Sequence, residues 1–137
     1  MIRTLICDDA LAFSTLVRHW LSACPDLEVV GAVGSGQAAV RAVGELEPDV
    51  ILLDHVLYDM PGGSGQLAPL LRERHPGLAI VLVSGMPDDQ LAALAHQCGA
   101  EGFVSKATKP EALCDAVRSA AGQPGRFRRG SLAAQPH

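Results

Sequence analysis

Five short apolar segments recur along the chain, and each is followed by a stretch in which apolar residues return every three or four positions. Runs of Val, Ile and Leu favour β-strands, whereas the three-to-four-residue spacing is typical of amphipathic helices. The predicted strands are Ile2–Cys7, Leu27–Val33, Asp49–Asp54, Leu78–Ser84 and Glu101–Ser105. This alternation predicts five successive strand–helix units within one domain of about 120 residues.

The stretches between these strands each place their apolar residues on one side of a helix. The predicted inward-facing residues are Phe13, Leu16, Val17, Trp20 and Leu21; Val40, Val43 and Leu46; Leu67, Leu70 and Leu71; Leu91, Leu94, Ala95 and Cys98; and Leu113, Ala116, Val117 and Ala120. Pro110 suits the first turn of the last helix, where a backbone N–H is not needed. The strand cores 50–53 and 80–83 are apolar without alternation, which is typical of a parallel sheet covered on both faces. We therefore expect a doubly wound, flavodoxin-like α/β fold with a five-stranded parallel sheet in the order 2-1-3-4-5.

Reactive side chains stand where four of the five predicted strands end. Asp8 and Asp9 follow the first strand, Asp54 ends the third, Ser84 ends the fourth and Lys106 follows the fifth. In an open sheet of this order, ligands bind beyond the carboxyl ends of the strands, at the switch point between the first and third. We therefore expect these five side chains to converge on one edge of the sheet.

Each of these residues also has a purely structural interpretation. One of the two aspartates could cap the first helix, Asp54 could be a turn residue, Ser84 could lie at the start of the fourth helix, and Lys106 could be an ordinary surface lysine. A cap does not explain two adjacent aspartates, and three carboxylates crowded together repel unless a cation lies among them. Their joint placement therefore favours a functional site.

The predicted carboxylate cluster of Asp8, Asp9 and Asp54 is suited to a metal ion. Carboxylates, water and one backbone carbonyl, which we assign to Val56, form the oxygen shell that Mg²⁺ prefers. In such a site the Asp54 carboxylate can attack phosphorus and form an acyl phosphate. Mg²⁺, the Lys106 ammonium and the hydroxyl at the end of the fourth strand would each contact one phosphoryl oxygen.

Five segments of the sequence together resemble the receiver domains of two-component response regulators. They are similar to the chemotaxis regulator and to receivers of the nitrate-regulator, LuxR-type subfamily. The segments are Leu5–Asp9, Pro25–Gly31, Pro48–Asp54, Val83–Gly85 and Gly99–Lys106. The resemblance covers residues 1–121, which we interpret as the receiver domain, while residues 122–137 lose periodicity and are interpreted as a flexible tail or linker.

This resemblance implies a phosphoacceptor signalling domain that catalyses only its own phosphorylation and dephosphorylation. It implies a histidine kinase as phosphodonor to Asp54, with Asp9 and Asp54 as Mg²⁺ ligands and Asp8 assisting. Ser84 and Lys106 would contact the phosphoryl group, and Phe103 would be the aromatic residue of the switch. We expect the switch to alter the surface formed by residues 87–121, which would then contact a partner or a second copy of the chain.

The sequence departs from the family pattern in three places. Residues 55–59 stand between the predicted phosphoacceptor and the Met-Pro-Gly-Gly segment at 60–63, so this loop is longer than usual. Ala107 follows Lys106 where proline is frequent, which removes the usual reason for a cis peptide. The sequence contains no helix-turn-helix segment of the kind that follows LuxR-type receivers.

The four cysteines, at positions 7, 24, 98 and 114, are widely spaced and form no Cys-x-x-Cys pair. We interpret them as buried apolar fillers in a reducing compartment, not as a zinc site or a disulfide framework. No apolar run is long enough to cross a bilayer, and the N-terminus passes straight into a predicted strand and does not resemble a signal peptide. Together with the cysteines, these features lead us to expect a cytoplasmic protein. Residues 1–121 hold 15 acidic and 8 basic side chains, a net charge of −7 that disfavours direct binding of nucleic acid.

Two other functional classes remain open. An aspartate-nucleophile phosphatase would need a second acid close to the nucleophile and a cap domain, but Asp59 lies five residues after Asp54, which is the wrong spacing. A nucleotide or flavin binder would need a glycine-rich loop after the first strand, where Asp8 and Asp9 would instead repel phosphate. We interpret His55, next to the predicted nucleophile, as a solvent-facing loop residue.

Overall fold

A computed structural model describes residues 1–122, and almost all of the predicted tail at 122–137 lies outside the described residues. Five strands alternate with five helices along this part of the chain. The strands are β1 (Ile2–Cys7), β2 (Leu27–Val33), β3 (Val50–Asp54), β4 (Ala79–Ser84) and β5 (Gly102–Ser105). The helices are α1 (Leu11–Ser22), α2 (Gly36–Leu46), α3 (Ser64–Arg74), α4 (Asp88–Cys98) and α5 (Pro110–Ala121). Every pair of neighbouring strands is parallel, in the order β2-β1-β3-β4-β5, which confirms the predicted fold.

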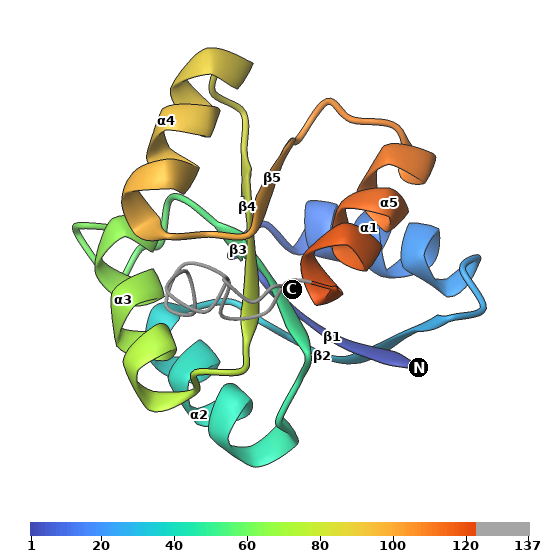
Figure 1. Ribbon diagram of the computed structural model, residues 1–137, viewed down its shortest axis with the longest axis horizontal. Coiled ribbons are helices and arrows are strands. Elements are labelled where there is room, and N and C mark those ends of the chain that lie inside the picture. Colours follow the sequence, from blue (N-terminus) through green and yellow to red (C-terminus); the bar gives the residue numbers. More distant parts are fainter. Residues whose placement is uncertain (123–137) are drawn as a thin grey trace, which may run out of the picture.

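The helices cover both faces of the sheet, α2, α3 and α4 on one side and α1 and α5 on the other (Figure 1). Successive side chains of a strand point to opposite faces. In β3, Ile51 and Leu53 accordingly enter the core beneath α2, α3 and α4, whereas Val50 and Leu52 enter the core beneath α1 and α5. Burial on both faces explains why the central strands read as continuous apolar runs.

Local signals in the sequence set the ends of several helices. The Ser35 side chain accepts a hydrogen bond from the backbone N–H of Ala38 and so caps α2, while Pro110 begins α5 as predicted. Gly99 ends α4 in the left-handed conformation, with φ of 70°, which glycine adopts without a steric penalty. One predicted inward residue, Leu16 of α1, is instead exposed.

The cysteine prediction was wrong for two of the four residues. Cys24, just after α1, and Cys114, in α5, form a disulfide across 90 positions of sequence. Spacing along the chain could not show this pairing, because it depends on how α1 and α5 meet on one face of the sheet. Cys7 and Cys98 are free, and burial raises the pKa of the Cys7 thiol to about 12, as suits an apolar filler. The disulfide removes the cysteine-based argument for a reducing compartment.

None of the helices within residues 1–122 combines the length and the apolar character that a bilayer crossing requires.

Candidate functional site

Three carboxylates meet at the carboxyl edge of the sheet. Asp8 follows β1, Asp54 ends the neighbouring strand β3, and one oxygen from each of Asp8, Asp9 and Asp54 lies within 4.8 Å of the others. Asp8 and Asp54 are buried, whereas Asp9 is exposed. The topology therefore brings together the three aspartates that the sequence pointed to, with one side open to solvent.

Lys106 joins this cluster from the loop that follows β5. Its Nζ lies 3.0 Å from Asp8 Oδ2 and 3.4 Å from Asp54 Oδ1. The backbone N–H of Lys106 donates to the carbonyl of Ser84 over 2.9 Å, so the pairing of β4 with β5 continues up to the lysine. This backbone pairing thus places the Lys106 ammonium beside the buried carboxylates of Asp8 and Asp54.

The charges of the cluster act on one another strongly because the site is partly buried. Burial, followed by the negative charge of Asp8, raises the pKa of Asp54, and Lys106 only partly offsets this effect. Burial lowers the pKa of Lys106, but Asp8 and Asp54 outweigh it, so the pKa is raised and the ammonium is charged at neutral pH. Three carboxylates and one ammonium leave two negative charges, which a divalent cation would balance.

The oxygens of the cluster also fit a hard cation. Asp8 Oδ1 accepts a hydrogen bond from the backbone N–H of Ala10 over 2.7 Å. Asp8 Oδ2 is buried and is paired with the Lys106 ammonium over 3.0 Å. Three carboxylates that each direct one oxygen to the same place form an all-oxygen set that suits Mg²⁺. Val56, the predicted carbonyl ligand, lies in the loop after β3 and is 66% exposed.

Ser84 and Phe103 lie on the neighbouring strands β4 and β5. Ser84 is buried, and its Oγ accepts a hydrogen bond from the backbone N–H of Met86 over 3.2 Å, which leaves the hydroxyl hydrogen free to donate elsewhere. Helix α4 starts only at Asp88, so Ser84 is not its cap. Phe103 is 38% exposed, so it is not the permanently buried core residue that its apolar side chain could suggest.

The long loop between β3 and α3 holds residues that the sequence did not reveal. The two Asp59 carboxylate oxygens accept hydrogen bonds from the backbone N–H groups of Gly36 and Gln37, over 2.8 and 2.9 Å. These bonds lower the pKa of Asp59. His55, expected to face solvent, is only half-exposed, and its Nδ1 lies 2.8 Å from the hydroxyl of the buried Ser64. In the sequence, the only sign of these loop contacts was the unusual length of the loop.

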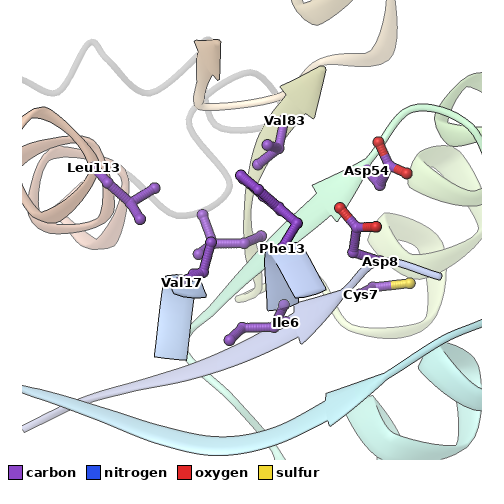
Figure 2. Close-up of a pocket in the computed structure, with 9 residues that line it drawn as sticks. Ile6, Cys7, Asp8, Phe13, Val17, Asp54, Val83 and Leu113 are labelled. Atoms are coloured by element: carbon purple, nitrogen blue, oxygen red, sulfur yellow. The ribbon is translucent and has the colours of Figure 1, made fainter. Parts of the chain in front are cut away.

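A small cavity lies behind the carboxylates, between the sheet and helices α1 and α5 (Figure 2). Its volume is about 10 Å³. The lining residues are Ile6, Cys7, Asp8, Phe13, Val17, Leu52, Asp54, Val83 and Leu113. A space of this size holds about one water molecule, whereas small-molecule pockets measure hundreds of cubic ångströms. This cavity therefore does not favour the nucleotide or flavin alternative.

The sequence matches a known protein family and is similar to known bacterial regulators. Residues 4–118 match the response regulator receiver domain family. The transcriptional regulatory protein LiaR of Bacillus subtilis (strain 168) is 36% identical over 125 residues, which cover 90% of this chain and 58% of LiaR. The response regulator GacA of Pseudomonas viridiflava is 35% identical over 120 residues, which cover 86% of this chain and 54% of GacA. The chain thus spans a little over half the length of these relatives.

The structure is also similar to solved receiver domains. The signal receiver domain of NarL from Mycobacterium tuberculosis superimposes with a TM-score of 0.80 and 29% sequence identity, covering 88% of this chain and 96% of the NarL chain. The receiver domain of RcsB from Salmonella enterica serovar Typhimurium, with a TM-score of 0.77 and 21% identity, shares the same fold. Since the family match covers most of the chain and agrees with the carboxylate site and the strand order, this chain belongs to the response regulator receiver domain family of two-component signalling.

Proposed function

We propose that this receiver domain accepts a phosphoryl group on Asp54 from a phosphohistidine of a sensor histidine kinase. A carboxylate oxygen of Asp54 attacks phosphorus, the bond between phosphorus and the histidine nitrogen breaks, and that nitrogen keeps the electron pair and then takes a proton. The observation that carries the proposal is the placement of Asp54 on the central strand β3, buried beside Asp8 and within 3.4 Å of the Lys106 ammonium.

The neighbouring side chains have distinct roles in this proposal. The Lys106 ammonium and the Ser84 hydroxyl each bind one phosphoryl oxygen as negative charge spreads over them. Asp8, Asp9, Asp54 and the Val56 carbonyl would hold Mg²⁺, which supplies positive charge for the third oxygen when bound. The Lys106 Nζ already lies 3.4 Å from Asp54 Oδ1, so the ammonium starts beside the carboxylate that would receive the phosphoryl group.

Phosphorylation would be transmitted through Ser84 and Phe103. An aspartyl phosphate on Asp54 adds negative charge and acceptor oxygens, which draw the Ser84 hydroxyl inward. Space is then vacated beside β5, into which the exposed Phe103 ring can turn without leaving a polar group unpaired. The surface formed by residues 87–121 changes as a result and contacts a partner or a second copy of the chain.

We further propose that the domain is the N-terminal part of a transcriptional regulator. LiaR carries the name of a transcriptional regulatory protein, and this chain matches a little over half of it. The net charge of −7 over residues 1–121 makes this domain itself a poor ligand for DNA, so a separate domain would bind DNA. The phosphatase alternative is not favoured, because both Asp59 oxygens already accept hydrogen bonds from backbone N–H groups at the start of α2.

Incubation with acetyl phosphate and Mg²⁺, followed by intact-mass measurement, tests the proposal. The wild-type protein should gain one phosphoryl group, EDTA should suppress the gain, and Asp54→Asn should abolish it. Asp89→Asn provides a matched control, because Asp89 is an exposed carboxylate in the first turn of α4 and is not one of the three clustered carboxylates. Uptake that persists in Asp54→Asn, or that is lost equally in Asp89→Asn, would contradict the assignment.

A further inference from the structure

The aromatic ring of Phe13 lies under the Lys106 ammonium. The Nζ atom is 4.9 Å from the ring centroid, within the distance at which a cation is attracted to the face of an aromatic ring. Phe13 belongs to the first turn of α1, and the ring lines the small cavity beside Asp8 and Asp54 (Figure 2). Three groups from three different elements therefore surround one ammonium.

These three groups act on Lys106 in different ways. Asp8 and Asp54 attract the ammonium by charge, from oxygens 3.0 and 3.4 Å away. The ring adds a contact on another side, through the negative face of its π-system. The lysine side chain is 29% exposed and has several rotatable bonds, so without the ring it would have more freedom to swing into solvent.

We propose that Phe13 is a positioning residue that holds the Lys106 ammonium beside Asp54 before phosphoryl transfer. This inference rests on the proposed function, since positioning matters only if Asp54 receives a phosphoryl group. Lys106 must meet charge as it develops on the phosphoryl oxygens, and an ammonium already in place spares the reorganisation that would otherwise slow the step. Phe13 acts through Lys106 and touches no reacting atom.

A simpler role for Phe13 is packing alone, because its ring also packs against the core beneath α1 and α5. Trp20 separates the two roles. It is another half-buried aromatic residue of α1 that packs against the same core. Trp20→Leu therefore removes an aromatic side chain from the same helix and core, yet should leave Lys106 untouched. Phe13→Leu removes the ring while keeping an apolar side chain, whereas Phe13→Tyr retains an aromatic ring at this position.

The first measurement uses the unphosphorylated protein. The sequence contains two lysines, Lys106 and Lys109, so ¹³C-labelled lysine gives two Cε–Hε signals and Lys109 provides an internal reference. The ring should shield the Lys106 Hε protons. Phe13→Leu should move this signal downfield, whereas Trp20→Leu and Phe13→Tyr should leave it close to the wild-type position. A Lys106 signal that Phe13→Leu does not move would overturn the contact, whatever the phosphorylation result.

The second measurement is the rate of phosphorylation by acetyl phosphate at saturating Mg²⁺. Phe13→Leu should be slower by about three- to five-fold, as expected for a partly exposed cation–π contact. Phe13→Tyr and Trp20→Leu should stay close to the wild-type rate. Equal rates in Phe13→Leu and wild type, or an equal loss in Trp20→Leu, would show that Phe13 only packs. If the wild type took up no phosphoryl group, the proposed function would fail, while the lysine signals would still test the contact.

Discussion

Asp59 Oδ1 accepts a hydrogen bond from the backbone N–H of Gly36 over 2.8 Å, which fastens the loop after β3 to the start of α2. The first N–H groups of a helix have no partner within the helix, and a carboxylate there also meets the positive end of the helix dipole. Met60 packs over the same glycine, where a Cβ would lie only 2.5 Å from the Met60 sulfur. The loop that follows Asp54 is therefore held at the start of α2 by hydrogen bonds and by packing.

Removing this cap should make stability depend less on pH. The hydrogen bonds from Gly36 and Gln37 lower the pKa of Asp59 below its ordinary value of 3.8. A lowered pKa stabilises the fold above pH 3.8, and this stability is lost as the pH falls through the folded-state pKa. Urea denaturation of Asp59→Ala should therefore show lower stability than wild type at pH 7, and the two proteins should converge in acid. A stability gap that is constant with pH would show that the charge of Asp59 is not involved.

Gly63 should tolerate no side chain. Its φ is 57°, and an added Cβ would overlap the backbone carbonyl oxygen of His55, which cannot move aside without breaking the loop. We expect Gly63→Ala to destabilise the protein by about 3 kcal/mol or more. Gly65, two residues later in α3, has open space where the methyl group of an alanine would lie. Gly65→Ala should be neutral or stabilising by up to about 1 kcal/mol, and equal losses in both variants by thermal denaturation would contradict the structure.

The regular elements could be predicted because their signals are local. For β1 and β2, the first and last residues predicted from the apolar runs agree with the structure. The other three strands begin one residue later than predicted. The meeting of Asp8, Asp54 and Lys106 followed from topology, since the carboxyl ends of parallel strands lie at one edge of the sheet. A short list of local patterns thus predicted both the fold and the composition of the cluster.

Contacts between distant segments could not be predicted in this way. Arg72 donates to the carbonyls of Leu78 and Gly99 and pairs with the buried Glu101 over 2.7 Å, joining α3 to the start of β5. Arg72 and Glu101 are 29 positions apart, and the sequence around each of them does not indicate that they form an ion pair. The Asp59 cap and the disulfide also depend on which loops and helices meet after folding. For these contacts, residue type and spacing leave many partners equally possible.

The disulfide between Cys24 and Cys114 should contribute substantially to stability. It closes a loop across 90 positions, for which chain-entropy arguments give roughly 3 to 5 kcal/mol. A dithiol reductant should therefore lower the urea midpoint of the wild type, but not that of the Cys24→Ala/Cys114→Ala double variant. Cys98→Ala is the matched control, since Cys98 is free and should leave the response to reductant intact. Four reactive thiols in the unfolded, non-reduced protein would disprove the bond.

The route from Asp54 to the exposed surface depends on which side of the sheet Ser84 and Phe103 occupy. Leu82 enters the core beneath α2, α3 and α4, and Ser84, two residues later, points to the same face. Phe103 is the register partner of Leu82 in the neighbouring strand, whereas Val104 enters the opposite core. Ser84 and Phe103 therefore share the α4 face, so inward movement of one can free space for the other.

This geometry predicts that Phe103 carries the response to phosphorylation. Mg²⁺ with beryllofluoride, a stable mimic of the aspartyl phosphate, should shift backbone amide NMR signals near Asp54 and also across residues 87–121. Phe103→Ala should retain the shifts near Asp54 but lose most of those in 87–121, because no ring remains to fill the space beside β5. Leu16→Ala is the matched control: Leu16 is 42% exposed, close to the 38% of Phe103, but it lies on α1, against the other face of the sheet. If the wild-type shifts stay confined to the neighbourhood of Asp54, or if Phe103→Ala responds like Leu16→Ala, Phe103 does not transmit the structural change caused by phosphorylation.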